Sequence, residues 1–150
     1  MSVLLEVENL RVPLPASRDG SPQSRPVDGV SFSLDRGQTL ALVGESGCGK
    51  SLTSLALLRL IPSPGRIEPG SRIRLDGHDL LALEGEALRQ IRGRRIGMIF
   101  QDPMTSLNPV FRVGDQIAEG LRAHRAVGRR EAFARAVGLL HEVRFRMPPR

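Results

Sequence analysis

The stretch LALVGESGCGKSLTS, residues 40–54, decides the fold of this 150-residue chain. The apolar run TLALVG, at 39–44, is short and continuous, which predicts a strand buried on both faces of a sheet. A glycine-rich turn follows it. The segment KSLTSLALLRLI, at 50–61, is apolar on nearly every side, which predicts a buried helix that PSPG at 62–65 ends. A strand, a glycine-rich turn and a helix in this order indicate a phosphate-binding site.

The turn itself matches the pattern G-x-x-x-x-G-K-[ST] in full at 44–51. Its glycines let backbone N–H groups point at phosphate oxygens, Lys50 reaches the β- and γ-phosphates, and the Ser51 hydroxyl is placed to bind Mg²⁺. By chance, the bare pattern arises in about one chain of this length in a few hundred. Lys50 is the only lysine among 22 basic residues. The predicted nucleotide-binding residues are Gly44, Glu45, Ser46, Gly47, Cys48, Gly49, Lys50, Ser51 and Leu52.

The composition limits the class of protein and the cell compartment that the sequence allows. Hydrophobic content of 40% and charged content of 25% are typical of one globular domain with a core, and the net charge is +6. The single cysteine, Cys48, excludes an internal disulfide. It is a redox-sensor candidate or a small residue tolerated in a tight turn. The N-terminus lacks the features of a signal peptide, and the longest apolar stretch, at 52–61, is about half a membrane span, so we expect a cytoplasmic chain.

Further segments predict a mixed α/β chain. Strands are expected at 3–12, 30–35, 71–77 and 95–100, with a Pro/Ser/Gly-rich loop at 13–26, a short exposed helix at 84–93 and a loop at 101–109. The rest is helical. One helix carries Val113, Ile117 and Leu121 four apart; the next, at 129–143, carries a face of Phe133, Ala136, Val137, Leu140 and Val143.

Two groups of polar residues have competing interpretations. The three histidines, His78, His124 and His141, share no metal-ligand spacing, which favours surface or partly buried positions over a metal site. Arg92, Arg94 and Arg95 form a basic cluster without interleaved aromatic residues, which favours a solvated face over nucleic-acid binding.

The P-loop, with IGMIFQDPMTSLNPVFRVGDQI at 96–117, resembles the nucleotide-binding subunits of ABC transporters, and more narrowly those of dipeptide, oligopeptide and nickel importers. The resemblance runs from residue 3 to about residue 143. It implies an ABC-type P-loop NTPase of the α/β class, with an antiparallel β subdomain and P-loop core at 1–103 and the beginning of a helical subdomain at 104–150. Gln101 would be the Q-loop residue that contacts Mg²⁺ and the attacking water. Leu14 takes the place of the usual adenine-stacking aromatic residue, so weaker or less base-selective binding is expected.

Family members continue with a signature motif near LSGGQ, an apolar strand ending in Asp-Glu and a His switch, and these 150 residues contain none of them. We therefore expect an incomplete ABC domain, from a frameshifted, truncated or deliberately shortened gene, that binds ATP and Mg²⁺ without hydrolysing ATP. The alternatives are a different P-loop ATPase, such as a DNA-repair ATPase or a nucleoside kinase, and a non-functional or dominant-negative remnant.

The same resemblance implies the partners. They are permease transmembrane subunits, a second ABC ATPase subunit, and indirectly a periplasmic or extracellular solute-binding protein, with no nucleic acid. The chain would lie at the cytoplasmic face of the membrane, held there by the permease.

Overall fold

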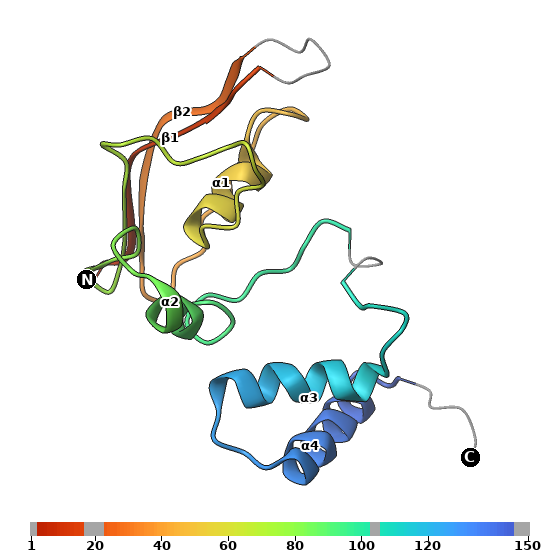
Figure 1. The fold of residues 1–150 in the computed structure, drawn as a ribbon. Coiled ribbons are helices and arrows are strands. Elements are labelled where there is room, and N and C mark those ends of the chain that lie inside the picture. The colour runs from red at the N-terminus through yellow and green to blue at the C-terminus, as the bar shows by residue number, and fades with distance from the viewer. Residues whose placement is uncertain (1–2, 17–22, 103–105, 146–150) are drawn as a thin grey trace. The chain divides into compact units, whose positions relative to one another are not determined.

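The computed structural model describes residues 3–16, 23–102 and 106–145. The chain groups into two compact units, Met1–Leu88 and Arg89–Arg150. Figure 1 shows the strands and α1 in the first unit, and α3 and α4 in the second. The predicted subdomain boundary after residue 103 falls outside the described residues and stays a prediction.

The sheet of the first unit has four antiparallel strands in the order β2-β1-β3-β4, and Figure 1 labels β1 and β2. The strands predicted at 3–12, 30–35 and 71–77 are confirmed. β1 and β2 both extend into the 13–26 segment, where a loop is predicted. β2 is an edge strand and tolerates Pro26, and at Pro13 β1 has β2 as its one neighbour, because β3 pairs with it only at Leu5–Glu8. The bounds are Val3–Leu14 for β1, Ser24–Asp35 for β2, Arg72–Leu75 for β3 and His78–Asp79 for β4.

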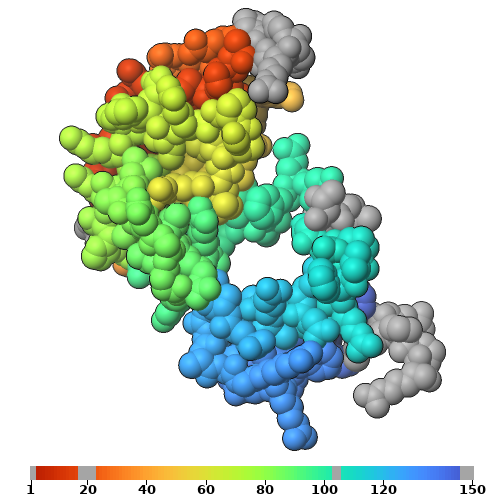
Figure 2. Space-filling model, in the orientation of Figure 1, coloured from red at the N-terminus to blue at the C-terminus, as the bar shows by residue number. Residues whose placement is uncertain are grey.

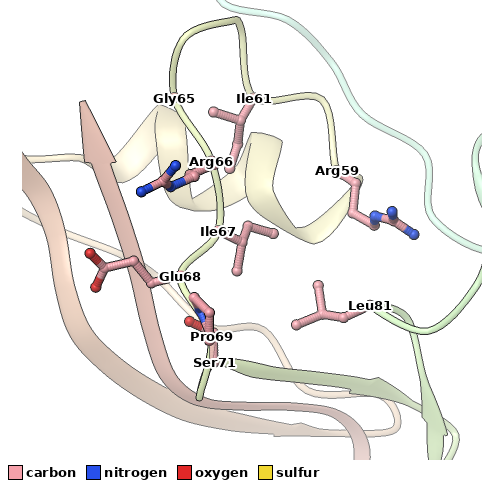
Figure 3. A pocket seen from close by; sticks show the side chains of 9 residues that line it. All are labelled: Arg59, Ile61, Gly65, Arg66, Ile67, Glu68, Pro69, Ser71 and Leu81. Atoms are coloured by element: carbon pink, nitrogen blue, oxygen red, sulfur yellow. The ribbon is translucent and has the colours of Figure 1, made fainter. Parts of the chain in front are cut away.

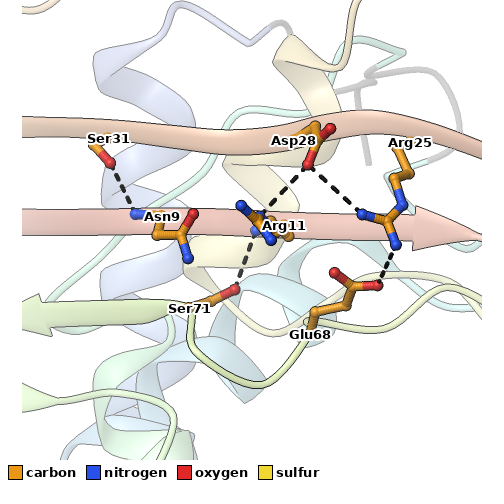
Figure 4. Close-up of polar contacts among 7 residues, drawn as sticks. All are labelled: Asn9, Arg11, Arg25, Asp28, Ser31, Glu68 and Ser71. Atoms are coloured by element: carbon orange, nitrogen blue, oxygen red, sulfur yellow. Dashed lines mark hydrogen bonds and ion pairs between the residues drawn. The ribbon is translucent and has the colours of Figure 1, made fainter.

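A bulge in β1 concentrates apolar side chains on the core side. Asn9 has a left-handed backbone (φ 49), and the pairing with β2 shifts register between Val7 and Leu10. Residues three apart face opposite sides of a regular strand, whereas the extra bulge residue lets Val7 and Leu10 both be buried. The Asn9 N–H donates to Ser31 Oγ at 2.8 Å (Figure 4). The fully buried large side chains are Val7, Leu10, Val12, Val27, Ile73 and Leu80.

One charged pair and one hydrogen bond link the segment before β3 to the sheet (Figure 4). Arg25 lies 3.9 Å from Asp28 and 3.3 Å from Glu68, and Arg11 Nε lies 3.5 Å from Asp28. The Arg11 N–H also donates to Ser71 Oγ at 3.1 Å. Exposed pairs of this kind contribute about 0–1 kcal/mol each, so they orient the segment more than they stabilise it.

The strands predicted at 39–44 and 95–100 are wrong. Neither segment forms a strand, apart from an isolated bridge within the second. Val43 is 92% exposed and Ile99 is 95% exposed. A strand with two apolar faces needs neighbouring strands to pair its backbone and layers to cover it. The sheet in the described residues provides no such neighbour for either run.

The helix predicted at 50–61 is shorter than expected. α1 spans Lys50–Leu57, and two of its residues, Thr53 and Ala56, are buried. Arg59 has a left-handed backbone (φ 52), and its guanidinium donates to the backbone carbonyl of Leu83. The helix therefore ends before the prolines, because this backbone conformation interrupts it. The short helix predicted at 84–93 is confirmed as α2, Gly85–Ile91, with no buried residue.

Two helices, α3 (Val113–His124) and α4 (Arg129–Glu142), pack against each other in the second unit (Figure 2). Three buried alanines, Ala118, Ala132 and Ala136, form the contact, with Ile117, Leu121 and Val127 packed around it. Within residues 3–16, 23–102 and 106–145, no helix combines the length and apolar character needed to cross a membrane.

The predicted apolar face of α4 is only partly right. Ala136 is buried, but Phe133 is 44% exposed and Val143 is 73% exposed, and Ala132 is buried in their place. Small alanines let the two helix backbones approach closely, so this face forms the contact. The Phe133 ring lies over Gly114 instead, where an added Cβ would come within 2.9 Å of Cε2.

Two isoleucine variants test whether Ile73 is packed in the core and whether the 95–100 segment is exposed. Ile73→Ala should lower the free energy of unfolding by about 2–5 kcal/mol, because Ile73 is fully buried. Ile99→Ala should change it by less than about 0.5 kcal/mol. Urea denaturation followed by circular dichroism measures both. Equal losses in the two variants would show that the 95–100 segment is packed.

Candidate functional site

The glycine-rich turn lies between a segment without regular secondary structure and the first turn of α1. Gly47 (φ 84) and Gly49 (φ 94) both have left-handed backbones, which side chains other than glycine rarely adopt. The turn is exposed from Gly44 to Cys48. This places the loop where a ligand from solvent reaches it directly.

Gly49 holds the loop against the sheet. A Cβ added to this residue would lie 2.1 Å from the Pro26 carbonyl oxygen and 3.1 Å from Val27 Cγ2. Only glycine permits this approach, so the second glycine of the motif has a packing role on β2 as well as a conformational one. The contact fixes the beginning of α1 relative to the strands.

Lys50 lies inside the loop that precedes it. Its Nζ donates to the carbonyls of Gly44 and Glu45, both at 2.7 Å, and lies 3.4 Å from Cys48 Sγ. The loop therefore closes around the ammonium group. The positive charge is held where the motif predicts the phosphates.

The first turn of α1 is suited to bind an anion. The helix begins without a side-chain cap and has no acidic residue in its first turn, so its N-terminal N–H groups and dipole favour negative charge. Thr53 Oγ1 donates to the Gly49 carbonyl at 3.0 Å, and Ser54 Oγ to the Lys50 carbonyl at 3.3 Å. These bonds tie side chains back to the loop. Sequence reasoning did not single them out, although a hydroxyl four residues after each acceptor is a recognisable signal.

Ser51 is exposed on this turn, directly after Lys50. Its hydroxyl oxygen is the hard ligand type that Mg²⁺ prefers, so the residue fits the predicted metal contact. Leu52 is half-buried. The binding roles of residues 44–52 remain predictions.

The structure places the other two predicted site residues as follows. Leu14 ends β1, half-buried, and a Cβ added to Gly65 would come within 2.9 Å of its Cδ2, so Leu14 packs beside that glycine. Gln101 is exposed in the second unit, in a segment without regular secondary structure. Their nucleotide contacts stay predictions. Residues 103–105 of the predicted loop after Gln101 lie outside the described residues.

The segment after Gln101 has a structural residue that sequence reasoning missed. Gln116 on α3 accepts from the Asn108 N–H at 2.9 Å, and its Nε2 donates to the carbonyls of Asn108 and Phe111 at 2.9 and 3.1 Å. Asn108 Oδ1 accepts from the Val110 N–H at 3.0 Å. Gln116 therefore holds the turn before α3. Only the Asn-Pro pair signals this turn in the sequence.

The first unit also has a cavity of about 420 Å³ lined by none of the motif residues (Figure 3). In this view the side chain of Ile67 projects toward Leu81, and those of Arg66 and Glu68 project the other way. Its lining comes from the segment 59–71 and from Leu81, with no residue of α1, and the lining residue Glu68 pairs with Arg25.

Comparisons with known proteins agree with the motif. The family model for the ABC transporter matches residues 27–147. The oligopeptide transport ATP-binding protein OppD of Bacillus subtilis is 47% identical over 145 residues, covering 97% of this chain and 40% of OppD. A putative peptide import ATP-binding protein of Brucella abortus is 49% identical over 146 residues, covering 93% of this chain and 42% of that protein.

A probable peptide ABC transporter ATP-binding protein of Sinorhizobium fredii is 47% identical over 127 residues, covering 85% of this chain and 38% of that protein. The chain thus spans about two fifths of the length of these relatives. The family match, the P-loop and the antiparallel sheet all indicate the same family. This chain belongs to the ABC transporter family, whose members include the ATP-binding proteins of peptide importers.

Proposed function

We propose that residues 44–52 bind ATP with Mg²⁺, and that the chain is part of the ATP-binding subunit of an ABC importer for peptides or a related solute. The observation that carries the proposal is the Lys50 ammonium, held inside the loop at the beginning of an uncapped helix. Its support is the family match over residues 27–147 and the names of the relatives.

Binding exchanges one set of Lys50 contacts for another. The carbonyls of Gly44 and Glu45 are neutral acceptors, whereas phosphate oxygens are charged and form stronger bonds with an ammonium. The N–H groups of the loop and of the first turn of α1 then surround the anion. Ser51 would hold the Mg²⁺, which neutralises charge on the phosphates when bound.

The roles proposed for two more residues rest on the family resemblance. The amide oxygen of Gln101 is suited to contact Mg²⁺ and the attacking water. Leu14 covers the adenine without stacking on it, so base selectivity is weak.

The proposed partners follow from the names of the relatives, which are peptide transport and import proteins. Permease transmembrane subunits and a second ATPase subunit would contact the chain directly, and a solute-binding protein would act through the permease. The chain would then lie at the cytoplasmic face of the membrane. These 150 residues contain no segment like LSGGQ and no apolar strand ending in Asp-Glu. We therefore propose that they bind ATP without hydrolysing it.

Removing the ammonium tests the binding site. Lys50→Ala should weaken binding of a fluorescent ATP analogue at least about tenfold, because a charge-assisted contact to the phosphates is lost. Arg66→Ala, which removes an exposed cation from the same unit, should leave the dissociation constant unchanged. Equal affinity of the Lys50→Ala variant and the wild type contradicts the proposed site.

A matched pair of glycine variants tests the packing of the loop. Gly47→Ala meets no atom within 4 Å, so it should cost only the left-handed conformation, about 1–2 kcal/mol. Gly49→Ala also collides with Pro26, and should cost about 2–5 kcal/mol and abolish nucleotide binding. Thermal unfolding with a nucleotide titration measures both effects. If Gly49→Ala binds nucleotide as the wild type does, the anchoring role of Gly49 is wrong.

Phosphate release tests the absence of turnover. The 150-residue chain with ATP and Mg²⁺ should release phosphate at the rate of its Lys50→Ala variant, which is the background rate. Faster release by the wild type would overturn this part of the proposal while leaving nucleotide binding intact.

A further inference from the structure

The positive charge of the chain is concentrated in the second unit. Residues 89–150 carry 13 arginines and 5 acidic residues, whereas residues 1–88 carry 9 basic and 11 acidic residues. The net charge of +6 therefore comes from the second unit alone. A basic unit attracts anionic surfaces, such as those of nucleic acids, acidic proteins and anionic membranes.

Three of these arginines gather around one cavity without an acidic partner. The cavity, of about 480 Å³, lies at the beginning of α3 and α4 and is lined by Arg112, Asp115, Arg129, Arg130 and Phe133. Among the described residues, no ion pair joins Asp115 or another acidic side chain to the three guanidinium groups. An anion from outside the chain can therefore pair with all three.

Exposed apolar side chains lie beside the same cavity. Val110 is 83% exposed and Phe111 is 62% exposed, and they are the two residues directly before Arg112. Gln116 fixes the turn that presents them, because its Nε2 donates to the Phe111 carbonyl at 3.1 Å. The ring of Phe133 adds a further apolar surface to the cavity wall. Exposed apolar side chains grouped beside charged ones mark an interaction surface.

From the concentration of charge, the three arginines and the exposed apolar side chains, we infer that this surface docks on an anionic phospholipid bilayer. The basic apolar patch consists of Val110, Phe111, Arg112, Arg129, Arg130 and Phe133. Its guanidinium groups pair with headgroup phosphates, and Val110 and Phe111 enter the boundary between headgroups and acyl chains. The inference does not rest on the proposed nucleotide site, which is in the other unit.

Nucleic acid carries the same charge, but the apolar side chains favour a bilayer. Bases stack on aromatic rings, and Val110, the most exposed apolar side chain of the patch, has no ring. At a bilayer interface, aliphatic and aromatic side chains are both removed from water. The patch is therefore complementary to a surface that is anionic and apolar at once.

Vesicle sedimentation with the 150-residue chain tests the class of surface. Phosphatidylcholine vesicles with about 30% phosphatidylglycerol should bind the chain at least about tenfold more tightly than vesicles of phosphatidylcholine alone, because only the former carry net charge. Sodium phosphate and sodium chloride of equal ionic strength should release the chain equally. Equal binding to both kinds of vesicle overturns the inference, and stronger release by phosphate assigns the arginines to the free anion instead.

Two pairs of arginine variants separate the patch from the overall charge. Arg129→Gln with Arg130→Gln should weaken binding to the anionic vesicles at least about tenfold, since each cation at the surface contributes attraction. Arg122→Gln with Arg125→Gln removes two exposed cations of the same unit outside the patch, and should weaken binding less than about threefold. Equal losses in the two double variants would indicate diffuse attraction and contradict a docking patch.

A matched pair of valines tests the apolar contact. Val110 and Val143 are 83% and 73% exposed in the same unit, so serine at either position should leave the melting temperature unchanged. Val110→Ser should weaken binding to the anionic vesicles at least about threefold, because an apolar side chain no longer enters the bilayer. Val143→Ser should leave vesicle binding unchanged.

Two results would reject the bilayer as the partner. One is unchanged vesicle binding in a folded Val110→Ser variant. The other is binding of a single-stranded DNA oligonucleotide more tightly than the anionic vesicles, with the loss in the Arg129→Gln, Arg130→Gln variant confined to DNA.

Discussion

The approach of the Gly49 backbone to the Pro26 carbonyl is the contact on which the phosphate loop depends. An added Cβ would lie 2.1 Å from that oxygen, so no other residue allows the loop to pack on β2 in this way. The contact fixes where α1 begins, and Thr53 ties the first turn back to Gly49. The Lys50 side chain lies in this loop, and its ammonium is held by the carbonyls of Gly44 and Glu45.

Local patterns predicted those parts of the fold that local chemistry determines. β1 and β3 alternate or carry β-branched residues, and Val7, Leu10 and Ile73 on these strands are fully buried. The apolar runs at 39–44 and 95–100 carry an equally strong strand signal, yet neither forms a strand. A strand buried on both faces depends on neighbouring strands and helices from elsewhere in the chain. The residues of the apolar run do not show whether those neighbours are present. On α4 the spacing favoured Phe133, but the close packing of Ala132 and Ala136 decides which face is buried.

The candidate site likewise has features that the sequence predicts and features that it does not. The motif names residues 44–51 because the spacing of glycines, lysine and serine is itself the chemical requirement. The packing of Gly49 on β2 and the enclosure of Lys50 require the positions of distant atoms, so the sequence does not reveal them. Gln101 and Leu14 rest on the family resemblance.

The single lysine makes the central claim directly measurable, because a chain with isotope-labelled lysine gives one side-chain signal, that of Lys50. The claim is that the Lys50 ammonium leaves the carbonyls of Gly44 and Glu45 for the phosphates of ATP. Titration with ATP and Mg²⁺, followed by nuclear magnetic resonance of this side chain, should shift the signal saturably, while adenosine should leave it in place. A Lys50 signal that does not move at saturating ATP would contradict the account.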